Sequence, residues 1–76
     1  MTISRKQFDV LEALAAAKKP LPQRELGKKA GQSVGTVNKV LKELTEAGYA
    51  EGGTITNEGF TALEPYRVKR AIFIAA

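Results

Sequence analysis

Apolar residues recur at helical spacing near the start of the chain, and this run predicts a helix over residues 4–17. One face of that helix carries the apolar residues Phe8, Leu11 and Leu14. Ser4 stands at the expected N-cap, and Gln7 three residues later completes the sequence pattern of a capping box. The helix is therefore expected to begin at Ser4 and to pack through one apolar face.

Two further helices are predicted, separated by a glycine. The first covers residues 22–30, with Pro22 in its first turn, where proline is tolerated, and Gly31 directly after its end. The second covers residues 33–47 and has Ser33 as its N-cap. Its expected core stripe, with spacings of three, four and three, is Val34, Val37, Leu41 and Leu44. A short helix, a tight turn and a longer helix together form a helix-turn-helix pattern.

A pair of glycines after the third helix indicates a β-hairpin. Gly52 and Gly53 separate two short extended segments at residues 49–50 and 55–56. Glycine adopts the positive φ that a tight hairpin turn requires. A helix-turn-helix followed by a small hairpin is typical of a winged helix-turn-helix domain, with a three-helix core and the hairpin as its wing.

The rest of the chain predicts a short fourth helix and then a strand. Asn57 is a suitable N-cap, and Pro65 is expected to end the helix because proline disfavours helical backbone at the residue before it. The apolar run 71–76 contains β-branched residues and is typical of a buried strand. We therefore predict a mainly α domain with a small β-hairpin over residues 1–66. Residues 67–76 are expected to form a basic and apolar strand that begins a following domain.

Composition narrows the chemistry that this chain can perform. Its 76 residues suffice for one domain with a small core, and they include neither cysteine nor histidine. Disulfides, thiolate or imidazole metal ligands, and Cys- or His-based nucleophilic catalysis are therefore excluded. We expect no catalytic residue, metal or cofactor in this chain. No apolar run approaches the roughly 20 residues needed to cross a bilayer, so a cytoplasmic protein without a membrane partner is expected.

Charge is distributed unevenly along the chain. Residues 1–42 contain nine Lys and Arg against three acidic residues, whereas residues 43–66 contain five Glu and no Lys or Arg. A basic half favours a polyanionic partner, most simply double-stranded DNA, because attraction to phosphate supplies most of the non-specific affinity. The alternative is a solvated basic surface with no partner, and charge alone favours neither.

The third predicted helix carries the candidate binding residues. Opposite its core stripe it presents Gly35, Thr36, Lys39, Lys42, Glu43 and Glu46. The N-terminal residues of such a recognition helix lie nearest to the bases in the major groove. Gln32 then suits adenine, and Lys39 suits guanine or phosphate. The N–H groups at the helix start, with Ser33 and Thr36, suit phosphate oxygens.

Each of these residues also has an explanation that needs no DNA. Ser33 serves as an N-cap in any case, and Thr36 and Lys39 can be plain surface residues. Gly35 costs the helix about 1 kcal/mol relative to alanine, which the close approach of a partner would explain.

The segment 33–44, followed by Gly48-Tyr49 and the glycine hairpin, resembles the MarR-like winged helix-turn-helix family. The resemblance extends over residues 4–64 and implies DNA binding in transcriptional regulation. It implies that the wing reaches the minor groove or the DNA backbone, and that DNA contacts come from the positions matching Ser33, Thr36, Asn38 and Lys39. We add Lys42 for its place on the same face. The chain departs from the family at the wing, where residues 51–54 contain no Lys or Arg.

The segment 63–76 has a second resemblance. It is similar to the junction at which a winged-helix domain meets the first strand of a sugar-phosphate or phosphocholine nucleotidyltransferase. This resemblance implies a regulatory or protein-interaction module of a cytidylyltransferase-like enzyme, with a following catalytic domain as partner and no obligatory DNA binding. Alternatively, residues 72–74 pair with the wing or pack on the first helix. A homodimer partner, if present, would contact the first helix or the C-terminal strand.

Overall fold

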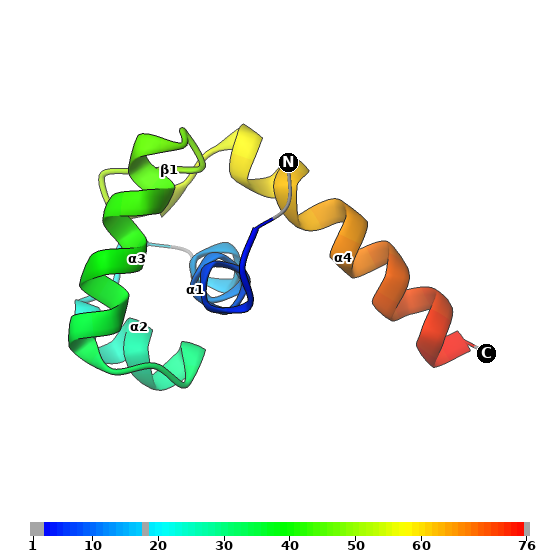
Figure 1. The fold of residues 1–76 in the computed structure, drawn as a ribbon, viewed down its shortest axis with the longest axis horizontal. Coiled ribbons are helices and arrows are strands. Elements are labelled where there is room, and N and C mark those ends of the chain that lie inside the picture. The colour runs from blue at the N-terminus through cyan, green and yellow to red at the C-terminus, as the bar shows by residue number, and fades with distance from the viewer. Residues whose placement is uncertain (1–2, 18, 76) are drawn as a thin grey trace.

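The computed structural model describes residues 3–17 and 19–75, with backbone alone for residues 67–75. Over these residues, four helices and one two-stranded antiparallel sheet follow in the order shown in Figure 1. The elements are α1 (Arg5–Ala16), α2 (Gln23–Ala30), α3 (Val34–Glu46), β1 (Ala50–Glu51), β2 (Thr54–Ile55) and α4 (Asn57–Ala75). This mainly helical architecture with a hairpin confirms the predicted fold class. Within the described ranges, no helix combines the length and the apolar character that crossing a bilayer demands.

The first three helices begin and end where local sequence signals place them. At α1, the Gln7 backbone N–H donates to Ser4 Oγ at 3.1 Å, and the Ser4 N–H donates to Gln7 Oε1 at 2.9 Å, which completes the capping box. Gly31 ends α2 with a φ of 70°. Such a left-handed residue lets the chain turn directly into α3.

The hairpin also forms as predicted. Ala50 pairs with Ile55 and Glu51 with Thr54 in antiparallel register. Gly52 and Gly53 make the turn with φ values of 58° and 82°, the positive pair that a two-residue hairpin turn of the right twist requires.

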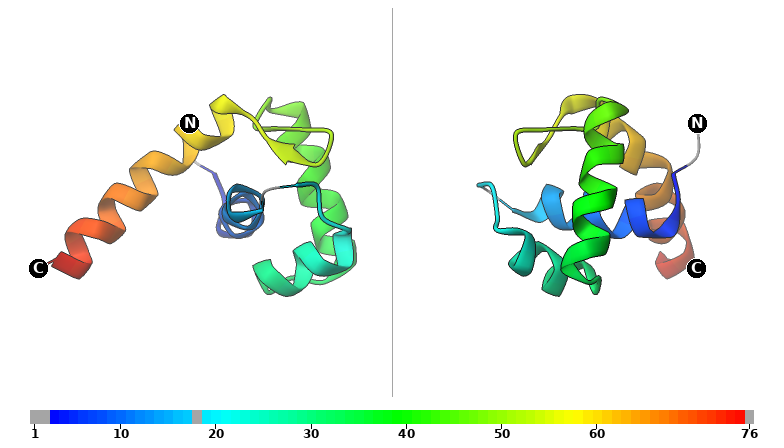
Figure 2. Two further views of the ribbon diagram at one scale, coloured as in Figure 1. Left: turned by 180° about the vertical axis from the view of Figure 1, so that it is seen from behind. Right: turned by 60° about the vertical axis from the view of Figure 1, so that its left-hand side comes forward.

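The core is built around α1, which the other elements enclose on several sides (Figures 1 and 2). Its Val10 and Leu11 are completely buried. Ala13 and Leu14 of the same helix are buried as well, and the other helices and β1 contribute the remaining buried apolar side chains: Leu26, Val37, Val40, Leu44, Ala50 and Leu63.

The core stripe predicted for α3 differs from the buried face at two positions. Val34 is 48% exposed and Leu41 is only half-buried, whereas Val40, which was not predicted, is 96% buried. Periodicity identifies residues that can share a face, but the neighbours of α3 decide which face is buried. Because α3 packs on both α1 and β1, its buried face runs through Val37, Val40 and Leu44.

The predictions for the last part of the chain are largely wrong. The fourth helix neither ends at Pro65 nor gives way to a strand, because α4 continues to Ala75. Residue 76 lies outside the described residues. A lone strand would leave its backbone groups unpaired, whereas a helix satisfies them within itself, and an apolar run of this length does not distinguish the two. That residues 67–76 begin a further domain stays a prediction.

Contacts on both sides of Pro65 hold α4 against α1. Leu63 is fully buried in the core. One turn later the ring of Tyr66 lies 5.3 Å from that of Phe8, and its hydroxyl accepts from the Ile3 backbone N–H at 3.3 Å. These contacts offset the backbone hydrogen bond that proline removes. Beyond Tyr66, α4 projects away from the other elements (Figure 1).

The hairpin is joined to the start of α4 by Thr56 and Gly59. Thr56, rather than the expected Asn57, caps α4: its hydroxyl accepts from the Gly59 N–H at 3.1 Å and donates to the Gly48 carbonyl at 2.6 Å. Gly59 is buried, and a Cβ there would lie 2.6 Å from Ile55 Cγ1 and closer still to the Tyr49 carbonyl oxygen. Only glycine therefore lets α4 approach the hairpin this closely.

We predict that Gly59→Ala lowers the free energy of unfolding by about 1–3 kcal/mol, because the added methyl group meets a backbone carbonyl that has little room to move. Urea unfolding followed by circular dichroism measures the effect. Gly35→Ala is the matched control, since a Cβ there meets no atom within 4 Å. This control should stabilise α3 by up to about 1 kcal/mol. Equal stability of the two variants would contradict the close approach at Gly59.

Candidate nucleic-acid interface

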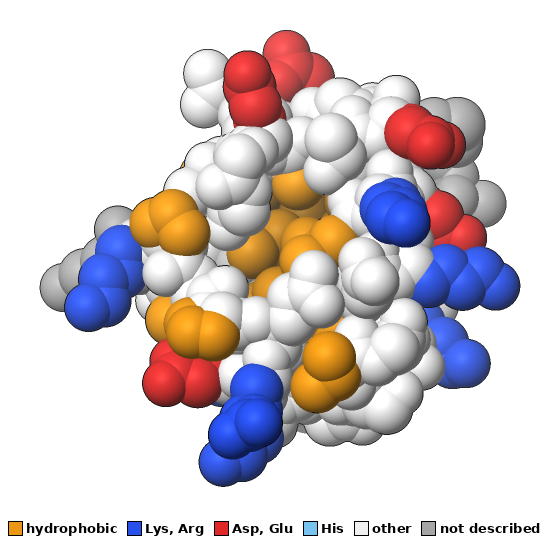
Figure 3. Space-filling view, turned by 90° about the vertical axis from the view of Figure 1, so that its left-hand side faces the viewer, with side chains coloured by type: hydrophobic (Ala, Val, Ile, Leu, Met, Phe, Trp, Pro, Cys, Tyr) orange, Lys and Arg blue, Asp and Glu red, His pale blue; other side chains and the backbone are white. Residues whose placement is uncertain are grey.

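All six residues predicted to meet DNA lie in α3 or just before its first residue. Four are exposed, namely Ser33, Asn38, Lys39 and Lys42, and two are half-buried, namely Gln32 and Thr36. Figure 3 looks at this side of the molecule, where Lys and Arg side chains stand at several points around an apolar hollow. Acidic side chains stand at the top of this view, at its right edge and at its lower left (Figure 3).

Two hydroxyl groups are joined at the start of α3. Ser33 Oγ accepts from the Thr36 backbone N–H at 3.2 Å and donates to Thr36 Oγ1 at 2.9 Å. Ser33 is therefore the N-cap, as expected, and its hydroxyl proton is already in use. Among the described residues, none accepts the proton of the Thr36 hydroxyl, so this group can donate to an anionic oxygen.

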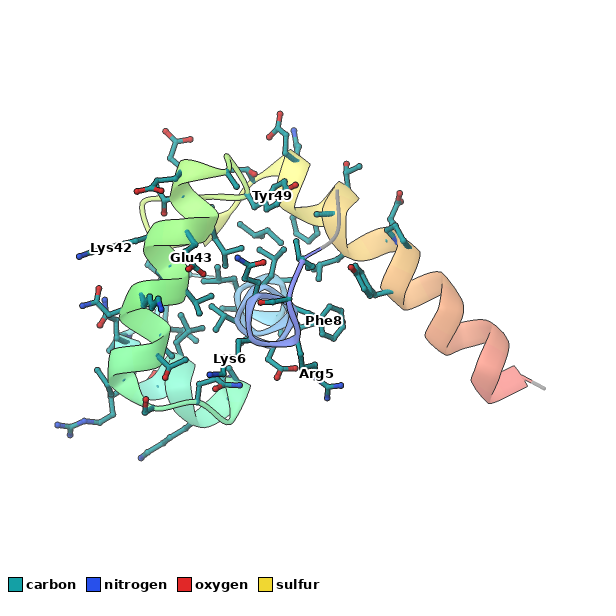
Figure 4. The ribbon with its side chains drawn as sticks, viewed as in Figure 1. Arg5, Lys6, Phe8, Lys42, Glu43 and Tyr49 are labelled. Carbon is teal, nitrogen blue, oxygen red and sulfur yellow. The ribbon has the colours of Figure 1, made fainter. Side chains whose placement is uncertain are left out.

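Two lysines and one glycine share the face of α3 opposite the core. Gly35, Lys39 and Lys42 follow one another at spacings of four and three, so they lie along one side of the helix. Figure 4 shows Lys42 pointing away from the domain. Among the side chains that the structure describes, none bonds to the ammonium group of Lys39 or Lys42. The absence of a side chain at Gly35 leaves the helix backbone accessible between them and the N-terminus.

Asn38 lies on the flank of this face. It lines a shallow hollow of about 340 Å³ between α3 and the start of α2, together with Lys42 and Gln23. Leu41 also lines this hollow, which gives the groove an apolar side. The structure therefore brings Asn38 and Lys42 together, whereas Thr36, two positions before Asn38, lies on a different side of the helix.

Gln32 makes a contact that the sequence did not predict. Its Nε2 donates to Asp9 Oδ2 in α1 at 3.3 Å, and Asp9 Oδ1 accepts from Arg5 Nε at 3.1 Å. Sequence reasoning missed Asp9 because 23 positions separate it from Gln32 and no local pattern joins them. The predicted base reader is thus anchored to α1.

The end of α3 nearest the hairpin has the opposite charge. Glu43, Glu46 and Glu51 are all exposed. Glu43 lies on the side of α3 that faces α1 (Figure 4) and accepts from Gln7 Nε2 at 3.2 Å. The basic character is therefore confined to the N-terminal two thirds of α3, while the wing presents a carboxylate. A polyanion would be attracted to the first part and repelled by the second.

Comparison with known proteins agrees with this geometry. The family model described as "MarR family" matches residues 1–54, which comprise α1, α2, α3 and β1 and reach the start of β2. Searches of curated proteins and of solved structures returned no match. The matched segment covers more than half of the 76 residues, and the chain therefore belongs to the MarR family of winged helix-turn-helix, DNA-binding transcription regulators.

Proposed function

We propose that the chain regulates transcription by placing α3 in the major groove of double-stranded DNA. The observation that carries this proposal is the face formed by Gly35, Lys39 and Lys42, where two lysines that bond to none of the described side chains follow an accessible stretch of helix backbone. Lysines on a helix that fits the groove supply both the attraction to phosphate and groups that reach base edges.

The individual roles follow from the hydrogen-bonding groups that each residue has left. Thr36 donates its hydroxyl proton to a phosphate oxygen, and Ser33 holds it in position. Lys39, near the middle of the face, reaches guanine or phosphate. Lys42 and Asn38 act at the hollow beside α2, where a DNA backbone would run along the groove.

The wing is expected to contribute little to affinity. It carries the exposed Glu51 and no basic residue, so contact with phosphate would be repulsive there. Binding then depends on α3 and the basic residues around it. The alternative of a nucleotidyltransferase module depended on a C-terminal strand, and the helical backbone over residues 57–75 removes that support.

The salt dependence of binding tests the electrostatic part of the proposal. With about six Lys and Arg neutralising phosphates, the logarithm of the affinity should fall against the logarithm of the salt concentration with a slope near −5. Fluorescence anisotropy with a labelled duplex measures this slope. A slope near zero, or no binding at low salt, would contradict binding through a basic face.

Combined substitution of Lys39→Glu and Thr36→Ala should reduce DNA affinity about 100-fold or more while the protein stays folded. The lysine is exposed and the threonine lies outside the core, so neither change touches the buried side chains. Lys29→Glu is the matched control. It reverses the same charge, but Lys29 lies beside the hollow between α1 and α2, away from the proposed face. Equal losses in the two proteins would indicate a general charge effect rather than a role of α3.

Gly35→Ala should separate folding from binding. Its methyl group enters open space in the free protein, so stability is kept or raised. In the complex the same methyl group stands where α3 lies closest to the duplex, and affinity is expected to fall about tenfold. Thermal unfolding and the anisotropy titration together give both quantities. Unchanged affinity would mean that the duplex does not approach α3 at Gly35.

A further inference from the structure

Gln32, directly before the N-cap of α3, is held by two neighbouring helices. Its backbone N–H donates to the Gly27 carbonyl of α2 at 2.8 Å. Its own carbonyl oxygen packs so closely on Gly27 that a Cβ there would lie 2.6 Å away. Its side chain donates to Asp9 of α1 at 3.3 Å. Backbone and side chain are thus fixed independently, which is unusual for a residue in a short turn.

The contact with Asp9 also determines which way the Gln32 amide points. An ionised carboxylate only accepts hydrogen bonds, so the amide nitrogen must face Asp9 and the carbonyl oxygen Oε1 must be the branch turned elsewhere. Asp9 is itself restrained, because its other oxygen accepts from Arg5 and its side chain is only 23% exposed. Within the described side chains, no donor engages Gln32 Oε1. An acceptor therefore remains available at the entrance of α3.

We infer that Asp9 is a positioning residue that makes Gln32 a reader of exocyclic amines on DNA bases. This inference rests on the proposed function and adds to it a preference for particular DNA bases. In the major groove, adenine N6 and cytosine N4 are donors, whereas guanine and thymine present acceptors at the corresponding positions. A carbonyl oxygen turned away from Asp9 can accept from adenine N6 or cytosine N4, whereas guanine O6 and thymine O4 offer it no donor. Because the amide is oriented before binding, little conformational freedom is lost when it contacts a base.

Asp9→Asn tests the inference because it keeps the shape of the side chain but adds a donor. The new amide can donate to Gln32 Oε1, so the Gln32 amide can turn round and offer its N–H groups instead. Wild-type protein and variants are used to select duplexes from a library with a randomised centre. Wild-type protein should prefer adenine or cytosine at one position by about tenfold. Asp9→Asn should also accept guanine or thymine there, and Gln32→Ala should lose discrimination at the same position.

Glu58→Gln is the matched control, since it removes one exposed carboxylate from α4 beside the hairpin. It should leave the selected sequence unchanged. In the free protein, the side-chain amide resonance of Gln32 in a ¹⁵N–¹H spectrum should shift in Asp9→Asn and stay in place in Glu58→Gln. Circular dichroism checks that each variant is folded. If Asp9→Asn does not fold, Arg5→Gln, which frees the carboxylate without removing it, should relax the same position to a smaller degree.

Three results would overturn the inference, and only one of them would also contradict the proposed function. Selection of the same sequence by Asp9→Asn and wild-type protein would show that Asp9 does not orient Gln32, with the proposed function intact. Sequence preference that Gln32→Ala leaves unchanged would show that Gln32 is not a reader. Failure of wild-type protein to bind any duplex at low salt would remove the proposed function itself, and the inference with it.

Discussion

Burial of α1 is the constraint on which the rest of the domain depends. This helix contacts α2, α3, α4 and β2, and its Val10 and Leu11 are excluded from solvent. A core this small gains about 1.5–3 kcal/mol from each fully buried aliphatic side chain of that size. Without α1, α2 and α3 would lose the apolar surface on which both of them pack, and the outer face of α3 would lose its fixed orientation.

The central place of α1 also lets half-buried residues near its start contact several other elements. Three consecutive residues there reach three different partners: Gln7 donates to Glu43 of α3, Phe8 lies against Tyr66 of α4, and Asp9 accepts from Gln32. Individual surface hydrogen bonds of this kind contribute only about 0.5–1.5 kcal/mol to stability. One of them also restricts direction, because the bond from Gln32 to Asp9 fixes which end of the Gln32 amide faces the carboxylate.

The N-terminal part of α3 is basic, whereas the end of α3 and the hairpin are acidic. This distribution differs from that of a winged helix with a basic hairpin. Lys39 and Lys42 have no partner among the described side chains, while Glu46 and Glu51 occupy the end of α3 and the hairpin. The hairpin also has a structural role. Ala50 of the hairpin is buried in the core. Gly59 of α4 packs closely against Ile55 and the Tyr49 carbonyl, and this contact attaches α4 to the hairpin.

Sequence alone determined the features that depend on neighbouring residues. The capping box at Ser4, the left-handed Gly31, the turn at Gly52-Gly53 and the cap at Ser33 are all local, and each forms as the residue types require. Tertiary structure decided the rest. In the folded protein Val40 is buried in place of Val34, and α4 continues past Pro65. Asp9 and Gln32, which are far apart in the sequence, form a hydrogen bond. Such outcomes depend on which surfaces come into contact when the chain folds. The pattern of apolar residues along one helix does not show where the neighbouring helices lie.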